Sequence, residues 1–163
     1  MKRRVKGSTV RVTDRQRRAK FSLFTIKRFA KAVLAHSRKQ VELHVVFVSD
    51  SEIRRLNRLY HGTNRPTDVL AFEKPSAWPS LPAEKPLLGE IIISVDRAFA
   101  YAKRYHVSVS EELLRYLVHG ILHLLGERDE KLADQKKMIR KQEELLNRLR
   151  PRGKVLLQDG NYL

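Results

Sequence analysis

Apolar residues recur along this chain with two spacings, and each spacing predicts a different kind of element. Brief runs rich in β-branched and aromatic residues predict strands at 10–13, 41–48, 68–72 and 89–94. Longer stretches with apolar residues three and four positions apart predict helices at 22–36, 49–60, 95–105, 109–125 and 132–149. Strands and helices mix without a strict strand–helix–strand repeat. We therefore expect an α+β fold in which about five helices cover one small mixed sheet of about four strands.

Serine residues stand where three of these helices are expected to begin. Ser22, Ser49 and Ser108 are each followed by a helical pattern, and a serine oxygen there can accept a hydrogen bond from a free first-turn amide. Ser108 is followed three residues later by Glu111, which completes a capping box. The start of the helix at 109–125 is therefore well defined by sequence.

The segments between these elements do not suggest a second domain. Four prolines within residues 75–86, around Trp78, predict an irregular loop, and a proline and a glycine follow the last helix. The chain of 163 residues is long enough to bury its own core. We expect a single domain over 1–163, with a strongly basic N-terminal segment at 1–40 and a loose tail at 151–163.

The distribution of positive charge along the chain indicates an anionic binding partner. The net charge is +16, and residues 1–40 hold 14 lysines and arginines but one acid, Asp14. Such a surplus attracts polyanions and releases counterions on contact, so we expect a nucleic acid or the ribosome as a partner. A solvated basic arm is the alternative. A membrane partner is not expected, because the apolar face of the helix at 22–36 suits a protein core.

Cysteine content and hydropathy indicate the cellular compartment in which the protein is expected. The absence of cysteine excludes disulfides and thiolate metal sites and fits a reducing compartment. No apolar run approaches the roughly 20 residues that span a bilayer. No apolar stretch follows Lys2, Arg3 and Arg4, so no secretory signal is expected. We therefore expect a cytoplasmic protein, of unknown oligomeric state.

The run from residue 119 to 129 carries the most specific chemistry. His119 and His123 are four residues apart on an expected helix and so share a face. Gly126 can end that helix and reverse the chain, and Asp129 follows three residues later. Two imidazoles and a carboxylate are a donor set for a catalytic divalent ion, with Zn²⁺ first and Mn²⁺, Fe²⁺ or Ni²⁺ as alternatives. Two hydrogen-bonded core histidines are the other interpretation.

Gly120 separates this motif from that of the zinc proteases. In those enzymes a glutamate that acts as general base follows the first histidine, whereas glycine cannot accept a proton. A glycine inside a helix costs about 1 kcal/mol relative to alanine. We expect either close approach of a substrate or tight helix packing to require it. A metalloprotease is correspondingly disfavoured.

These residues resemble the YbeY family, bacterial single-strand-specific endoribonucleases of ribosomal RNA maturation. Four segments match in order: Leu56-Asn57-x-x-Tyr60 with the run at 66–72 (Pro-Thr-Asp-Val-Leu-Ala-Phe), the run at 88–91 (Leu-Gly-Glu-Ile), the run at 119–126 (His-Gly-Ile-Leu-His-Leu-Leu-Gly), and Met138 with the run at 142–146 (Gln-Glu-Glu-Leu-Leu). Together they lie within residues 41–149. No motif of the basic first 40 residues has a counterpart.

The resemblance implies a metzincin-like His-x-x-x-His metal helix and metal-dependent cleavage of single-stranded RNA, in ribosomal RNA maturation and ribosome quality control. It implies a metal site at His119, His123 and a third position, where the family usually has histidine and this chain has Asp129. Glu130 would substitute if the turn were one residue longer. The family's loop arginine is replaced here by His61.

The implied catalytic residues lie on the loop expected to face the metal. His61 and Arg65 would contact phosphate, and His61 could also act as an acid or base. Asp68 or Glu90 would orient a ligand or accept a proton, although a structural role suits each position better. A non-catalytic RNA- or ribosome-binding assembly factor, with a structural or absent metal, is the alternative function.

Overall fold

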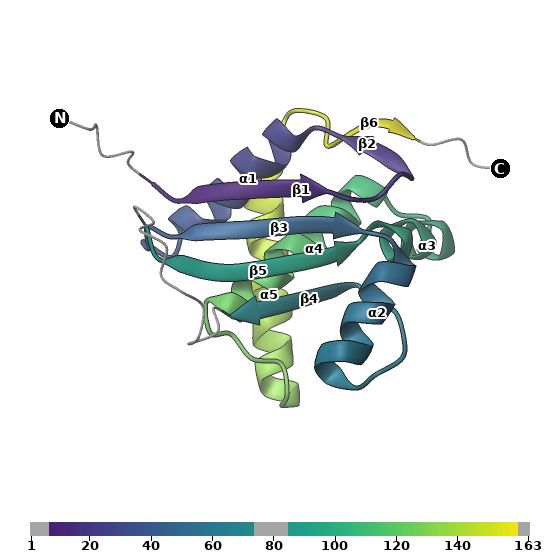
Figure 1. The fold of residues 1–163 in the computed structure, drawn as a ribbon. Helices are drawn as coiled ribbons and strands as arrows, with labels where there is room; N and C mark the ends of the chain where they lie inside the picture. Colours follow the sequence, from purple (N-terminus) through teal and green to yellow (C-terminus); the bar gives the residue numbers. More distant parts are fainter. Residues whose placement is uncertain (1–6, 74–84, 160–163) are drawn as a thin grey trace.

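The architecture comes from a computed structural model that describes residues 7–73 and 85–159. The elements in chain order are β1 (Thr9–Asp14), β2 (Ala19–Phe21), α1 (Leu23–Ala35), β3 (Glu42–Val48), α2 (Asp50–His61), β4 (Val69–Glu73), β5 (Leu87–Ser94), α3 (Val95–Tyr105), α4 (Val109–Leu124), α5 (Leu132–Leu149) and β6 (Leu156–Asp159). Figure 1 shows their arrangement. Nearly all of the predicted proline-rich loop lies outside the described residues.

The main sheet has four strands in the order β1-β3-β5-β4. β1, β3 and β5 are parallel, and β4 runs antiparallel to β5 at one edge, where Ala71 pairs with Ile91. The predicted α+β fold, with its small mixed sheet and five helices, is confirmed. β4 is the last strand in this order, so one of its sides has no neighbouring strand among the residues that the structure describes.

The sheet has two unequal faces because successive side chains of a strand point to opposite sides. The larger core lies between one face, which includes Val45 and Ile91, and helices α1, α3, α4 and α5. Helix α2 covers part of the other face, where Ile53 packs with Ile92 and Leu70. In Figure 1, α4 and α5 lie behind the strands and α2 lies beside the start of β4.

The tail beyond residue 151 is not loose throughout, which corrects the prediction for its described part. β6 pairs antiparallel with β2, a short strand that the sequence pattern did not reveal. Val155 is buried in the core, and its carbonyl accepts a hydrogen bond from the Ser22 amide. The partner strands lie at opposite ends of the chain, so neither segment carries a local signal for the pairing.

The basic N-terminal segment is part of the domain from residue 9 onward. It contributes β1, β2 and α1, while most of the charged side chains in its described part, including Arg17, Lys20 and Lys31, remain exposed. An amphipathic pattern allows this, because the apolar face of α1 enters the core and the cationic face stays in water. Among the helices of the described residues, none is long and apolar enough to cross a membrane.

Candidate metal centre

Helix α4 presents His119 and His123 on one side near its C-terminal end. Ser108 caps its start by accepting a hydrogen bond from the Glu111 amide, as the capping box predicts. Most of the remaining α4 side chains are buried against the sheet and its neighbouring helices. The two histidine side chains are 29% and 30% exposed, so they lie at the border of the core and open to solvent.

Gly126 ends this helix and reverses the chain. Its φ of +99° is unfavourable for residues with a side chain. The amide of Gly126 bonds the carbonyl of His123, and the amide of Glu127 bonds the carbonyl of Leu122, which is the Schellman pattern of helix termination. The reversal brings Asp129 back over the last turns of α4.

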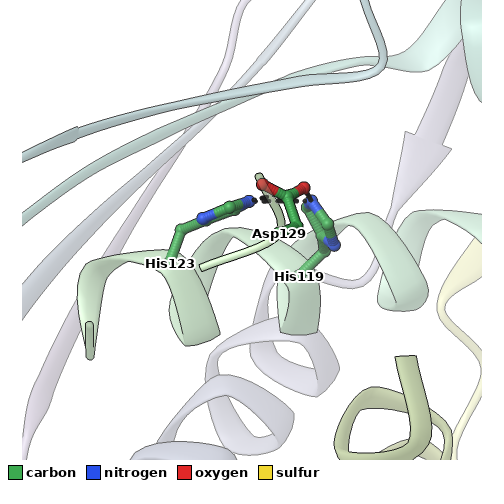
Figure 2. Close-up of side chains that lie close together, drawn as sticks. All are labelled: His119, His123 and Asp129. Carbon is green, nitrogen blue, oxygen red and sulfur yellow. Dashed lines mark hydrogen bonds and ion pairs between the residues drawn. The ribbon is translucent and has the colours of Figure 1, made fainter. Parts of the chain in front are cut away.

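Asp129 and the two histidines converge on one point, as Figure 2 shows. The Nε2 atoms of His119 and His123 are 3.0 Å apart, and Asp129 Oδ2 lies 3.9 Å and 3.5 Å from them, respectively. A tetrahedral zinc with ligands at 2.0–2.1 Å separates its donor atoms by about 3.3 Å. The three distances scatter about that value, so the donor atoms fit a tetrahedral divalent ion.

Glu130 is not part of this convergence. Its side chain is 79% exposed and its carboxylate lies 3.9 Å from Arg128 Nη1. Of the two acidic residues that the sequence offered for the third position, Asp129 is the one brought to the histidines.

Gln142 of helix α5 orients one of the histidine rings. Its Oε1 lies 2.9 Å from His119 Nδ1, and the residue is only 7% exposed. An amide oxygen can only accept, so Nδ1 donates and the Nε2 lone pair of a neutral ring faces Asp129. Burial lowers the pKa of His119 below its ordinary value of 6.5, which favours this neutral, ligating form at pH 7.

A chain of polar contacts continues from Gln142 into the interface of α4 and α5. Gln142 Nε2 donates to Glu143 Oε1, which also accepts from Arg115 Nε at 2.6 Å. Arg115 further contacts Glu111 and the nearly fully buried Glu112. These contacts place the Gln142 amide nitrogen toward Glu143 and its oxygen toward His119. The sequence signal for Gln142 was a polar residue among the apolar positions of the last helix.

A cavity of about 400 Å³ opens in front of the three donors. Its wall includes all three, together with His61 and Glu73. His61 is the exposed last residue of α2, and Glu73 ends the edge strand β4. The structure thus brings His61 to the same cavity as the donors. Glu73 is a cavity carboxylate that the sequence patterns did not single out.

Arg65, Asp68 and Glu90 do not line this cavity. Arg65 is exposed on the loop after α2, where its carbonyl accepts a hydrogen bond from Asn57 Nδ2. Asp68 lies 3.6 Å from Arg97, which supports its structural role. Glu90 precedes Ile91, whose side chain packs on the α4 face, so strand alternation turns Glu90 to the opposite face. The Glu90 side chain therefore lies on the face of the sheet away from α4.

Gly120 is explained by packing between the metal helix and the sheet. A Cβ at this position would lie 2.8 Å from a side-chain carbon of Ile91, below the distance that real Cβ atoms show. Of the two reasons considered for this glycine, tight helix packing therefore suffices. The close contact holds the middle of α4 against β5.

Comparison with known proteins agrees with the fold and the motif. A model of the family described as endoribonuclease YbeY matches residues 11–150. The endoribonuclease YbeY of Anaeromyxobacter sp. (strain Fw109-5) is 41% identical over 138 residues, which are 84% of this chain and 70% of the relative. That of Desulfitobacterium hafniense (strain Y51) is 45% identical over 125 residues, 74% of this chain and 80% of the relative.

A solved structure extends the comparison to the fold. The solution structure of a Thermotoga maritima protein matches with a TM-score of 0.56 and 24% identity, over 87% of this chain and 92% of the other. The family match begins at residue 11, so it includes most of the basic segment for which no motif had a counterpart. On the extent of that match and the identity of these relatives, the chain belongs to the endoribonuclease YbeY family.

Proposed function

We propose that this protein is a metal-dependent endoribonuclease that cleaves single-stranded RNA and acts in the cytoplasm in ribosomal RNA maturation and ribosome quality control. The observation that carries the proposal is the convergence of His119, His123 and Asp129 at the wall of an open cavity, in a chain of net charge +16. Its partners would be ribosomal RNA and the ribosome or its assembly factors. The relatives are named endoribonucleases, which supports RNA as the substrate.

His119, His123 and Asp129 would hold one ion per chain, Zn²⁺ in preference to Mn²⁺, Fe²⁺ or Ni²⁺, because two imidazoles and one carboxylate suit it. Such an ion supplies a Lewis acid that polarises a phosphoryl oxygen and acidifies water. The carboxylate of Asp129 carries a negative charge where most of the family has a neutral imidazole. It therefore offsets part of the charge of a divalent ion.

The other cavity residues would handle protons and phosphate. An imidazole can both donate and accept a proton, so His61 would donate a hydrogen bond to a phosphate or transfer a proton at the cavity wall. Glu73, in the same wall, would accept a proton from an attacking water. Arg65, exposed outside the cavity wall, would contact the RNA backbone at a neighbouring phosphate.

Metal dependence is tested by removing and restoring the ion. Purified protein is expected to contain about one equivalent of zinc by elemental analysis and to cleave a single-stranded RNA but not its duplex form. Dialysis against a chelator should abolish cleavage and added Zn²⁺ should restore it. The reason is that the ion held by the three donors would be what activates the phosphodiester. Cleavage that is indifferent to the chelator would contradict the proposal.

The same measurement separates the alternative function. A non-catalytic assembly factor would bind RNA in a salt-dependent manner, because its lysines and arginines neutralise phosphates, but would show no cleavage with any of the four ions. Metal-free protein with salt-sensitive RNA binding and no restored activity would favour that alternative.

Gln142→Leu should weaken zinc binding about tenfold with little change in fold, because outer-shell partners of ligating histidines contribute 10- to 100-fold to affinity. The substitution leaves His119 Nδ1 without its acceptor. Competition with a chromophoric chelator measures the effect. Gln142→Glu keeps an acceptor and should retain affinity, and Gln135→Leu, exposed on the same helix, is the matched control. Unchanged affinity in Gln142→Leu would show that the hydrogen bond does not position the ring.

A further inference from the structure

Three aromatic rings form a continuous cluster beside the cavity. The ring of Tyr60, near the end of α2, lies 5.1 Å from the ring of Phe72 on β4, measured between centroids. The ring of His61 lies 6.0 Å from Phe72, and their planes are inclined by only 13°. We call Tyr60, His61 and Phe72 the aromatic cluster.

Packing accounts for Phe72 but not for Tyr60. Phe72 packs against the small core on the α2 side of the sheet. Tyr60 is 61% exposed and its neighbour Leu59 is 65% exposed, so most of this apolar surface lies in water. An aromatic ring with so much exposed surface contributes little to the core. It presents a flat apolar face at the end of the helix.

The aromatic cluster is continuous with the metal centre. His61 belongs both to the cluster and to the cavity wall that holds His119, His123 and Asp129. The cluster therefore extends from the cavity wall, through Phe72, to the exposed ring of Tyr60. A nucleotide adjoining a phosphate bound in the cavity would have its base within reach of this surface.

Unpaired arginines lie on the helix that carries Tyr60 and on the loop that follows it. Helix α2 carries Arg55 and Arg58, and Arg65 lies on the following loop; all three are exposed, and no ion pair involves them within the described part of the chain. Arg54 donates to Asn64 Oδ1 and holds that loop near the helix. Cationic side chains interleaved with an exposed aromatic ring are the usual means of binding single-stranded nucleic acid, by phosphate contact and base stacking.

We propose that Tyr60, supported by Phe72 and His61, is a stacking site for an unpaired nucleobase next to the scissile phosphate. This inference rests on the proposed function for its choice of ligand. It also gives a reason for single-strand selectivity. Bases within a duplex are stacked on both faces, so no face is free to contact a protein ring, whereas an unpaired base has a free face. Arg55, Arg58 and Arg65 would hold the flanking phosphates.

The test compares two RNA probes with metal-free protein in chelator, so that nothing is cleaved. One is a short fluorescent oligo-adenosine strand, and the other is the same strand with abasic riboses. Wild-type protein should bind the base-containing strand about tenfold more tightly. Tyr60→Ala should lose this preference and Tyr60→Phe should keep it, because stacking needs the ring and not the hydroxyl. Tyr101→Ala, 43% exposed on α3, is the control that should keep it.

The outcomes test the stacking site independently of the proposed nuclease function. Equal binding of both strands by the wild type, equal weakening of both by Tyr60→Ala, or no binding of either would overturn the stacking site. Loss of quenching of a 2-aminopurine base in Tyr60→Ala would support stacking independently of affinity. A Tyr60-dependent preference in a protein that cleaves no RNA with any divalent ion would support the stacking site while overturning the proposed function.

Discussion

Replacement of His123 by alanine is expected to abolish both stoichiometric zinc binding and RNA cleavage. His123 Nε2 lies 3.0 Å from His119 Nε2 and 3.5 Å from Asp129, so its loss removes one of three converging donors. Loss of a ligand should exceed the 10- to 100-fold loss of affinity that outer-shell changes cause. Cleavage should fall to the level of the chelated wild type. Isothermal titration with Zn²⁺ and a single-stranded RNA assay measure the two effects.

The His123→Ala variant should remain folded, because its side chain is 30% exposed and its removal leaves no large cavity. His36→Ala removes an exposed histidine at the C-cap of α1; it is the matched control and should bind zinc and cleave RNA normally. Metal-dependent cleavage that survives His123→Ala would contradict the assignment of the centre. Loss of cleavage with retained zinc binding would indicate that His123 acts on the substrate and does not bind the metal.

Arg115→Met is expected to produce the largest loss of stability, about 3 kcal/mol by urea denaturation at pH 7. Arg115 contacts Glu111, Glu112 and Glu143, and only 4% of the Glu112 side chain is exposed. Removing one partner of a buried ion pair typically costs 3–5 kcal/mol, because the other charge stays buried without compensation. The lower end applies here, since Arg115 and Glu143 are partly exposed.

The pH range of the recovery identifies Glu112 as the cause, because the pKa of Glu112 is raised above 4.5 whereas Arg115 holds that of Glu143 below 4.5. Burial raises the pKa of Glu112 above its ordinary value of 4.5, and Arg115 opposes this rise. Without Arg115, the native state should bind the Glu112 proton more tightly than the unfolded state, so stability recovers as pH falls toward 4.5. The deficit of Arg115→Met should therefore shrink in acid. A deficit that is constant over this range would exclude Glu112 as its source.

Two further variants complete the Arg115 experiment. Arg115→Met combined with Glu112→Leu should regain much of the lost stability, because an apolar pair replaces a buried charge pair at little cost. Arg128→Met removes an exposed arginine with a 3.9 Å ion pair and should change stability by less than about 0.5 kcal/mol.

Local patterns predicted the helices closely. The helices at 95–105 and 132–149 have the predicted bounds, and Ser22, Ser49 and Ser108 each cap a helix by accepting from the amide three residues on. Capping, periodicity and the turn at Gly126 depend on residues within a few positions of one another. Such interactions can be predicted from the sequence, because residues a few positions apart are brought together by local backbone geometry, independently of the rest of the fold.

Contacts between distant segments could not be predicted in this way. The β2–β6 pairing joins the two ends of the chain, and the bond from His119 to Gln142 spans 23 residues. Residues of α2, β4 and α4 line one cavity, so the place of Glu73 in its wall is visible only in three dimensions. The face on which Glu90 lies follows from sheet register, which a motif shared with a family does not specify.

The amino-acid sequence by itself determined the helices, the pair of histidines on one helical face and the glycine that returns an aspartate to them, because each depends on local backbone geometry. Only the tertiary structure decided that Asp129 rather than Glu130 meets the histidines, that Gln142 orients His119 and that His61 reaches the same cavity. The physical reason is that these relations depend on packing between elements, which fixes distances that no spacing along the chain encodes.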